Sequence, residues 1–422
     1  MRDGWGNASQ RRGGADPLPD AATLEAFFSG CYHASLLREE ARPVSFRAIL
    51  TAPTLFAPEG RPPEGLLRLA FSNAIHFDPT ELRRLSVAAD PHRTLIGVWA
   101  DAMEGLRIWG VINSGTRWLR NVQGGRRVGA PLPHVPVVYV HAPGRIEVYR
   151  GYELVGKLQG GTLSGSRVDV FDSHWLPSQF THFRDEIVAR HEAARKRAEE
   201  LGGGAWAPLE PSLTRKIAER MLKRVIAILR DAGHGGTIVF VPTGNAAQPS
   251  AKDALIDLRY GLAAGAPRMS FTNLLVDILN RLAQLQGALG ERGPMPVGWR
   301  EFEAATDDEL ATLDEALFET AHLIAELAAA DGAVVLTKSH ELLGFGGMIS
   351  GRLPDVESVN RALDLEGERV AEEETGNVGA RHRSAYRLVA ATPGSVAVVV
   401  SQDGGVRFVC QQDGRVTYWE QD

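Results

Sequence analysis

Short apolar runs separated by turn residues dominate the first half of the chain. Between residues 93 and 122, two apolar runs are divided by Glu104-Gly105. The stretch 134–163 continues in the same style, with Pro143-Gly144 at one of its turns. Such spacing predicts an antiparallel sheet. Residues 22–40 carry a helical pattern, so we expect a strand-rich α+β domain in this half.

The second half alternates amphipathic helical patterns with short apolar runs. One helix is predicted between Ser212, a candidate N-cap, and Gly233, because its apolar residues repeat every three or four positions: Leu213, Ile217, Met221, Val225 and Ile228. Further helices are expected at 270–285 and 316–330, and apolar strands at 237–242, 331–337, 395–401, 406–410 and 416–420. The pattern predicts a mixed β-sheet covered by helices, so the fold class of the whole chain is α+β.

A charged helical pattern followed by glycines and prolines separates the two halves. The pattern breaks at Gly202-Gly203-Gly204, and Pro208 and Pro211 follow. A solvated helix that leads into a linker is the simplest interpretation. We therefore predict four segments along the chain, namely a disordered N-terminus at 1–20, a first domain at 21–203, a linker at 204–210 and a second domain at 211–422.

Composition narrows the class of protein. A chain of 422 residues is long enough for two or more domains with cores of their own. The net charge of −6 argues against nucleic acid or an acidic membrane surface as a partner. Cys31 and Cys410 lie too far apart in sequence for a metal-type spacing. No apolar run approaches a membrane span, and the first 20 residues lack the apolar core of a signal peptide, so we expect a cytoplasmic protein without a membrane partner.

Two arginines and a histidine stand together at a predicted helix start. Arg381, His382 and Arg383 follow Gly379 and precede Ser384. A helix N-terminus presents free backbone N–H groups, and arginines add forked cationic donors, so this arrangement suits a polyphosphate. An alternative is a pair of surface arginines that form ion pairs with the acidic run at 372–374. The residues themselves favour neither interpretation.

An acidic residue marks the junction between a predicted helix and a predicted strand. Asp331 is followed by Gly332 and Ala333, directly before a buried strand. One carboxylate beside phosphate-binding arginines is what Mg²⁺ or Mn²⁺ needs to bridge a protein and a nucleotide. The plainer alternative is a turn in which Gly332 supplies an unusual backbone conformation.

Taken together and in this order, the two motifs resemble the catalytic domain of the diadenylate cyclases. Those enzymes carry Asp-Gly-Ala after a helix and a later Gly-Thr-Arg-His-Arg motif, which is followed by a strand that ends in Val-Ser-Glu or a similar triplet. The resemblance extends from Pro211 to the C-terminus and is strongest after Ile324. The first half is similar to DACNV, a probable sensor domain that accompanies such cyclases.

The resemblance implies a role for each matching residue. Asp331 would bind the catalytic metal and help to activate the attacking 3′-hydroxyl, with His382 near the metal. Gly332 and Ala333 would let the nucleotide approach the backbone. The remaining positions would border the adenine (Leu343 and Gly344), hold the triphosphate (Gly379, Arg381, His382, Arg383 and Ser384) or complete the phosphate site (Ser401 and Gln402).

Two positions depart from the family pattern. Ala380 stands where many members have threonine, and Gln402 stands where many have glutamate. The first change removes a hydroxyl and the second removes an acidic ligand, so both bear more on catalysis than on nucleotide binding.

The resemblance implies an enzyme, a diadenylate cyclase that condenses two ATP molecules into cyclic di-AMP and two pyrophosphates with Mg²⁺ or Mn²⁺. Because one domain would hold one ATP, two active sites must face each other, so a homo-oligomer is expected. The N-terminal domain would respond to an unknown small ligand. Two alternatives remain: a catalytically inactive sensor that binds a nucleotide or cyclic dinucleotide, and a cyclase with a different base preference.

Overall fold

In the computed structural model the chain forms two compact units. The structure describes residues 19–57, 59–60, 62, 65–101, 103–115, 132–159, 161–165, 169–242, 255–263, 270–288 and 295–421. The N-terminal unit comprises Met1–Val122 and Arg126–Arg167, and the C-terminal unit comprises Gln123–Gly125 and Val168–Asp422. Positions 1–18 of the segment expected to be disordered lie outside the described residues. Helices and mixed sheets confirm the α+β class.

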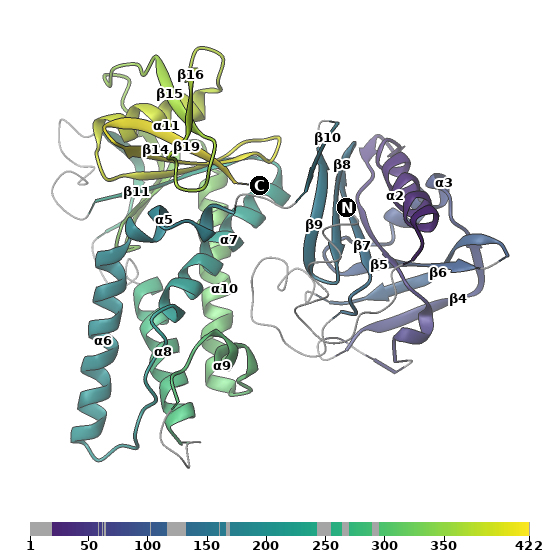
Figure 1. Ribbon diagram of the computed structural model, residues 1–422, viewed down its shortest axis with the longest axis horizontal. Coiled ribbons are helices and arrows are strands. Elements are labelled where there is room, and N and C mark those ends of the chain that lie inside the picture. The colour runs from purple at the N-terminus through teal and green to yellow at the C-terminus, as the bar shows by residue number, and fades with distance from the viewer. Residues whose placement is uncertain are drawn as a thin grey trace. The chain divides into compact units, whose positions relative to one another are not determined.

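An eight-stranded sheet forms the N-terminal unit (Figure 1). Its strand order is β10-β9-β8-β7-β3-β5-β6-β4, and β3 and β5 run parallel while the other neighbours are antiparallel. A two-stranded hairpin stands beside it. The elements are α2 (Ala21–Ser35), β1 (Arg38–Glu39), β2 (Arg42–Pro43), β3 (Phe46–Leu50), η1 (Pro53–Leu55), β4 (Leu67–His76), α3 (Pro79–Ser86), β5 (Thr94–Asp101), β6 (Gly105–Asn113), β7 (Pro136–Ala142), β8 (Arg145–Arg150), β9 (Glu153–Gln159) and β10 (Thr162–Gly165).

Alternating residues of this sheet enter two separate cores. In β3, Phe46 and Ala48 belong to the core that includes Phe27 and Leu82 of α2 and α3, whereas Ile49 belongs to a second core around Trp109. Side chains of a strand point to opposite faces in turn, so one strand can supply both cores. The predicted sheet and the helix near residues 22–40 are therefore both present, with one parallel pair that the turn spacing did not reveal.

The C-terminal unit is built on a nine-stranded mixed sheet with the order β12-β14-β13-β11-β17-β18-β19-β15-β16. The pairs β11–β13 and β15–β19 are parallel, and the other neighbours are antiparallel. Its elements are η2 (Val170–Asp172), α5 (Trp175–Ser178), α6 (Thr181–Glu200), α7 (Leu213–Ala232), β11 (Gly236–Val241), β12 (Ile256–Gly261), α8 (Ser270–Ala288), α9 (Trp299–Ala304), α10 (Asp308–Ala329), β13 (Ala333–Thr337), β14 (Leu342–Ile349), β15 (Ser358–Ala362), β16 (Val370–Glu374), α11 (Ala380–Ala391), β17 (Val396–Val400), β18 (Val406–Gln412) and β19 (Arg415–Gln421).

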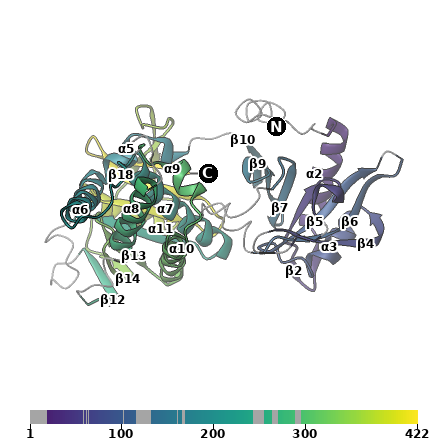
Figure 2. The same ribbon diagram turned by 90° about the horizontal axis from the view of Figure 1, so that it is seen from below.

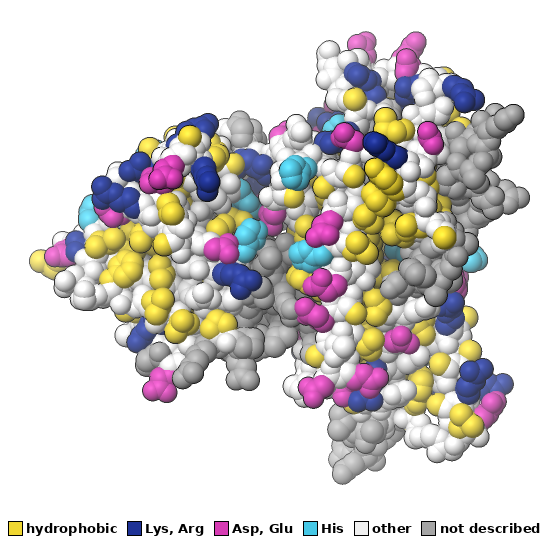
Figure 3. Space-filling view, turned by 180° about the vertical axis from the view of Figure 1, so that it is seen from behind, with side chains coloured by type: hydrophobic (Ala, Val, Ile, Leu, Met, Phe, Trp, Pro, Cys, Tyr) yellow, Lys and Arg dark blue, Asp and Glu magenta, His cyan; other side chains and the backbone are white. Residues whose placement is uncertain are grey.

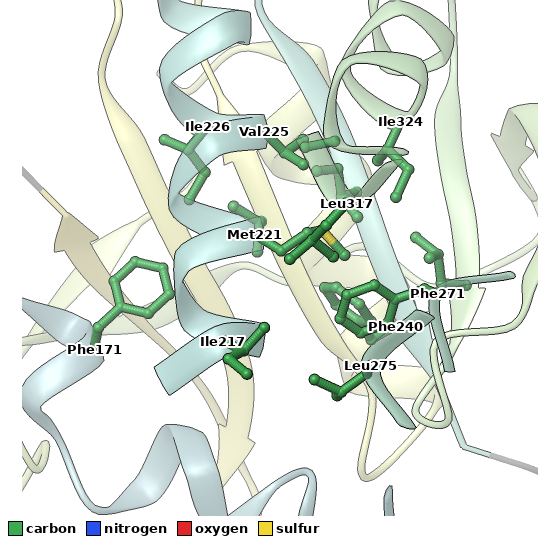
Figure 4. Packing of buried hydrophobic residues seen from close by; sticks show 14 of the residues in the cluster. Phe171, Ile217, Met221, Val225, Ile226, Phe240, Phe271, Leu275, Leu317 and Ile324 are labelled. Atoms are coloured by element: carbon green, nitrogen blue, oxygen red, sulfur yellow. The ribbon is translucent and has the colours of Figure 1, made fainter. Parts of the chain in front are cut away.

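Helices cover both faces of this sheet, which explains the wholly apolar central strands. Helices α7, α8 and α10 pack together over one face (Figures 1 and 2), and α11 covers the other. In Figure 4, Met221 and Val225 of α7 lie beside Leu317 of α10 and Phe240 of β11. Strands that are buried on both faces lose the alternation of polar and apolar residues. The predicted Gly233 stop is confirmed, with φ of +67°, whereas Ser212 occupies the N-cap position without a side-chain cap.

The boundary between the two units lies at residue 167/168 and not near Gly203. Helix α6 packs on α8, and its Phe183 and Ile187 are buried in the same core as α7 and α10. Residues 204–210, predicted as a linker, are also part of this packing, because the Ala207 N–H donates to the carbonyl of Ala283. The expected boundary was therefore wrong: α6 looks solvated in sequence because its buried stripe is narrow.

Among the described residues, no helix combines the length and the apolar character needed to cross a membrane.

Candidate functional site

Strand register brings the two sequence motifs to the same edge of the C-terminal sheet. Thr237 of β11 pairs with Ala333 in parallel β13, and Gly236 pairs with Val400 in antiparallel β17. The loops before β11 and β13 and the loop after β17 therefore meet at one edge. Neighbouring strands lie about 4.8 Å apart, so the Asp331 loop and Ser401 are separated by about 10 Å across the sheet.

The N-terminus of α11 reaches this edge. Gly379 is its N-cap, and Arg381 in the first turn donates from Nη1 to the carbonyl oxygen of His234 at 3.0 Å. His234 and Gly235 form the turn between α7 and β11. A Cβ added to Gly235 would lie 2.9 Å from Arg381 Nη1 and 3.1 Å from the backbone nitrogen of Gln402. The structure thus brings Arg381 and Gln402 together around Gly235.

The Asp-Gly-Ala segment forms a tight loop with an exposed carboxylate. Asp331 is exposed, and Ala333 is buried as the first residue of β13. Gly332 has φ of +106°, and a Cβ there would lie 2.6 Å from the backbone carbon of Gly346 in β14. Only glycine fits such a close backbone crossing. The turn interpretation of Gly332 is therefore correct, and it leaves Asp331 exposed at the sheet edge, open to a ligand.

The arginines do not form the surface ion pairs considered from the sequence. Arg383 is exposed and donates from Nη1 to the carbonyl of Val378 at 2.9 Å, within its own loop. In the acidic run, Glu373 pairs with Arg361 at 3.3 Å and Glu372 lies 3.9 Å from Arg415. No ion pair between this run and Arg381 or Arg383 occurs in the described part of the chain. Both guanidinium groups thus contact backbone carbonyls, which leaves their charge available to an anion.

His382 is a neutral histidine in a cationic environment. Burial lowers the pKa of its ring, and the charges of Arg407 and Arg381 lower it further, while Asp403 opposes them, so that the pKa is about 4. The ring therefore carries no charge at neutral pH and offers one nitrogen lone pair. A neutral imidazole of this kind can accept a hydrogen bond or bind a metal.

Arg407, which lowers the pKa of His382, is held by contacts with α11 and with β19. Arg407 donates from Nη1 to the Tyr386 hydroxyl at 3.0 Å, and its guanidinium lies 4.2 Å from the centre of the Tyr418 ring. The Tyr418 hydroxyl donates to Glu373 at 2.6 Å. These contacts join α11 to β18 and β19, so the helix N-terminus is presented on a rigid support.

The loop after β17 contributes a carboxylate that the sequence motifs did not assign. The Ser401 hydroxyl donates to the Asp403 carboxylate and lies 3.1 Å from the carbonyl of Gly405. Gln402 is exposed between them, and Ser384 of α11 is half-buried. The sequence Ser401-Gln402-Asp403 contained the signal for this carboxylate. An acid stands one residue after Gln402, the position at which many family members have glutamate.

Leu343 and Gly344 were expected to border the adenine, but neither lies in the loop that contains Asp331. Leu343 is buried in the core beneath α11, and Gly344 pairs with Val335 in the middle of the strand pair. Tyr260 of β12 is closer to the loop. A Cβ added to Gly346 would lie 3.2 Å from Tyr260 Cδ2 and 3.6 Å from the backbone oxygen of Asp331.

Tyr260 is suited to stack on a planar ligand. Its side chain is 47% exposed, and its ring stacks on Phe345 with centroids 4.7 Å apart. The Arg259 guanidinium lies 5.5 Å from the ring centre on the same segment. An exposed aromatic ring beside Asp331 can stack on a base. Nothing in the local sequence of β12 separates this tyrosine from an ordinary strand residue.

The exposed Asp331 carboxylate at this edge is of a kind that can bind a metal ion. No group of three or more His, Cys, Asp or Glu side chains suited to a metal occurs among the described residues. Mg²⁺ is commonly bound by one or two carboxylates together with substrate phosphates and water. A single exposed carboxylate such as Asp331 is consistent with that mode.

Comparison with known proteins bears on the first half of the chain. A family model described as the probable sensor domain DACNV matches residues 14–113, which lie within the N-terminal unit. No curated protein and no solved structure matches the chain. Residues 14–113 are therefore similar to this probable sensor domain.

Proposed function

We propose that the C-terminal unit is a diadenylate cyclase, which condenses two ATP molecules into cyclic di-AMP and releases two pyrophosphates. The observation that carries the proposal is the meeting of three loops at one sheet edge. One loop holds an exposed carboxylate at Asp331, the second begins a helix with Arg381 and Arg383, and the third holds Ser401 and Gln402. This combination matches the needs of nucleotidyl transfer, in which charge is neutralised and the reacting groups are aligned.

In the proposed reaction, each ribose 3′-hydroxyl attacks the α-phosphorus of the other ATP. A new P–O bond forms, the bond from the α-phosphorus to the oxygen that bridges to the β-phosphate breaks, and pyrophosphate leaves with the electron pair. The hydroxyl proton passes to the Asp331 carboxylate or to solvent. When bound, Mg²⁺ or Mn²⁺ would neutralise phosphate charge and favour the deprotonated hydroxyl.

The protein's own residues would bind and orient the nucleotide. Arg381 and Arg383 supply guanidinium donors for phosphate oxygens, and the free N–H groups of the first turn of α11 face the same ligand. Neutral His382 would accept a hydrogen bond or bind the metal without adding to the cationic charge. Tyr260 would stack on the adenine.

Two such sites must face each other, so the proposal includes a homodimer during catalysis. Hydrophobic side chains form a band on one face of the C-terminal unit, on the right in Figure 3. Exposed large hydrophobic residues of this unit include Leu323 and Met348, the latter with 59% exposure. Contact between copies would bury such residues and so favour association. Under this proposal the N-terminal sensor domain responds to a small ligand and regulates the pairing.

The test is to incubate the purified full chain with ATP and Mn²⁺ and to identify the products by mass spectrometry. Cyclic di-AMP and pyrophosphate in a 1:2 ratio would support the proposal. Parallel incubations with GTP, CTP and UTP test a different base preference. The absence of any cyclic dinucleotide under all conditions would reject cyclase activity.

A receptor that binds without turnover is a second candidate, because Gln402 is an amide where many cyclases have an acid. Calorimetric titration with ATP and with cyclic di-AMP separates the two functions. Tight binding of cyclic di-AMP with no product from ATP would favour the receptor, and product formation would exclude it.

A further inference from the structure

A cavity of about 360 Å³ lies in the C-terminal unit, at the opposite end of β13 from the candidate nucleotide site. Asp331 precedes this strand, whereas His340, which lines the cavity, follows it in the turn before β14. Five strand residues span about 15 Å, so the cavity is separate from the Asp331 loop. Its lining comes from η2, the segment of α5 and α6, the first turns of α7 and this turn, and it includes Phe171, Phe180, Phe183, Ala218, Leu222 and His340.

His340 stands in an aromatic environment at this cavity. Its ring centre lies 4.3 Å from that of Phe183, 5.0 Å from that of Phe271 and 5.4 Å from that of Phe180. The residue is only 9% exposed, and its ring forms a hydrogen bond with the backbone of Lys338. An imidazole held among phenylalanines at the wall of a cavity gives an apolar site with one placed polar group, which is the usual composition of a small-molecule site.

The backbone at His340 supports a specific role. Its φ of +58° is in the left-handed region, which glycine or asparagine adopts more readily than histidine. Such a conformation is strained and tends to occur at ligand sites. The turn would therefore form more easily without an imidazole. Burial lowers the pKa of the ring to about 3 against the opposing effect of the Lys338 hydrogen bond, so the imidazole is neutral at pH 7 and keeps one acceptor nitrogen.

Charged residues lie at the rim of the cavity. Arg184 and Arg215 both line it and both are exposed. Each forms a surface ion pair, Arg184 with Asp185 at 2.8 Å and Arg215 with Glu219 at 3.3 Å. Glu219 also lines the cavity and is half-buried, and burial raises the pKa of its carboxyl, so the lining holds two arginines and only one acidic group. The rim therefore attracts an acidic group while the interior accepts an apolar, planar body.

We propose that this cavity binds a small planar aromatic or heteroaromatic acid. Its ring system would stack among Phe180 and Phe183, a polar ring atom would pair with His340, and its anionic group would lie between Arg184 and Arg215. The volume is in the range of small-molecule sites, which are mostly apolar with a few placed polar groups. The inference is independent of the nucleotide chemistry at the other end of β13.

The test uses two fluorescent probes and the full chain. 8-Anilinonaphthalene-1-sulfonate has an aromatic body and an anionic group, and N-phenyl-1-naphthylamine has the same body without the sulfonate. We expect saturable binding of the sulfonate probe to native protein and at least tenfold weaker binding of the neutral one. Ala218→Phe, which fills the cavity, should weaken sulfonate binding at least tenfold. Ala232→Phe, at the exposed C-terminal end of the same helix, should leave it unchanged.

Further variants test the polar contacts. The double variant Arg184→Gln/Arg215→Gln should reduce the preference for the sulfonate probe to less than threefold. His340→Asn keeps a residue that tolerates the left-handed turn, so it tests the ring if Ala218→Phe does not fold. Wild-type affinity in Ala218→Phe and in His340→Asn, with native melting curves, would overturn the proposal. No saturable binding of the sulfonate probe to the wild-type protein would overturn it equally.

Discussion

Arg381 donates a hydrogen bond from Nη1 to the backbone oxygen of His234 at 3.0 Å, and so joins the first turn of α11 to the turn between α7 and β11. Arg383, two residues later, is exposed, and in the described part of the chain it donates only within its own loop, to Val378 and Gly376. The two arginines therefore differ in their roles. Arg381 links two elements at the sheet edge, whereas Arg383 is the one more available to a ligand.

This difference makes Arg383→Lys a sharp test of phosphate binding. Lysine keeps the charge but cannot reproduce the forked pair of donors. Loss of one charge-assisted hydrogen bond costs about 1.5–3 kcal/mol, which corresponds to roughly a ten- to hundredfold loss of turnover or ATP affinity. Arg369→Lys changes another exposed arginine of the same unit and is the matched control, so it should leave turnover and ATP affinity unchanged. Wild-type kinetics and affinity in Arg383→Lys would rule out a phosphate role.

Replacing Asp331 with asparagine should abolish turnover without harming the fold. The carboxylate is exposed, so the change removes charge and a metal ligand but no packing. We expect product formation to fall at least a hundredfold, while the melting temperature shifts by no more than about 2 °C, as is usual for surface substitutions. Glu326→Gln removes an exposed acid from the same helix end and should retain activity. Substantial activity in Asp331→Asn would contradict the metal role.

A methyl group at Gly332 should disturb both the fold and the site. Alanine would be strained at φ of +106°, and its Cβ would meet the backbone of Gly346, which cannot move aside as a side chain can. The strain alone amounts to about 1–3 kcal/mol, so the melting temperature of the C-terminal unit should fall by several degrees. Gly351→Ala adds a methyl group in open space and serves as the control. Equal melting temperatures for the two variants would show that the backbone at Gly346 can move away from the added methyl group.

Stability of the C-terminal unit should fall in mild acid because of His340. Its pKa is about 3 in the folded protein and ordinarily about 6.5. Between these pH values the imidazole is protonated in the unfolded chain but not in the native protein. The contribution of His340 to the free energy of unfolding is therefore fully present above pH 6.5 and declines as the pH falls towards 3. The decline is up to about 1.4 kcal/mol per pH unit. The free energy of unfolding, measured with urea at pH 7 and at pH 5, should decline less in His340→Asn than in the wild-type protein. Hydrogen exchange of the β13 amides at the same two pH values should show the same difference.

A fragment of residues 169–422 should fold alone, whereas residues 204–422 should not. The longer fragment keeps Phe171, Phe183 and Ile187, all of which are buried in the core of the unit. Loss of large buried apolar side chains costs about 2–5 kcal/mol each, so the shorter fragment loses more than a typical domain can tolerate. Cooperative melting, followed by circular dichroism, distinguishes the two. A soluble, cooperatively melting 204–422 fragment would contradict this account of α6.

Local patterns in the sequence were enough for the elements of the C-terminal unit that carry a strong period. The spacing of Leu213, Ile217 and Met221 predicted α7, because a helix that buries one face must repeat its apolar residues every three or four positions. The apolar runs of β11, β13 and β17 predicted strands for a similar reason, since both of their faces are covered. The packing of α6 into the C-terminal unit could not be predicted in this way, because only Phe183, Ile187 and His191 are buried along its length.

What the sequence by itself determined was the two motifs, Asp331 with Gly332 and the run from Arg381 to Arg383, since their chemistry depends on residue type and immediate neighbours. Only the tertiary structure decided what lies beside them. Tyr260 reaches the Asp331 loop, Leu343 is buried away from it, and His340 meets phenylalanines from three other elements. These contacts join residues far apart in the chain. They depend on strand register and helix packing, which no local window of sequence encodes.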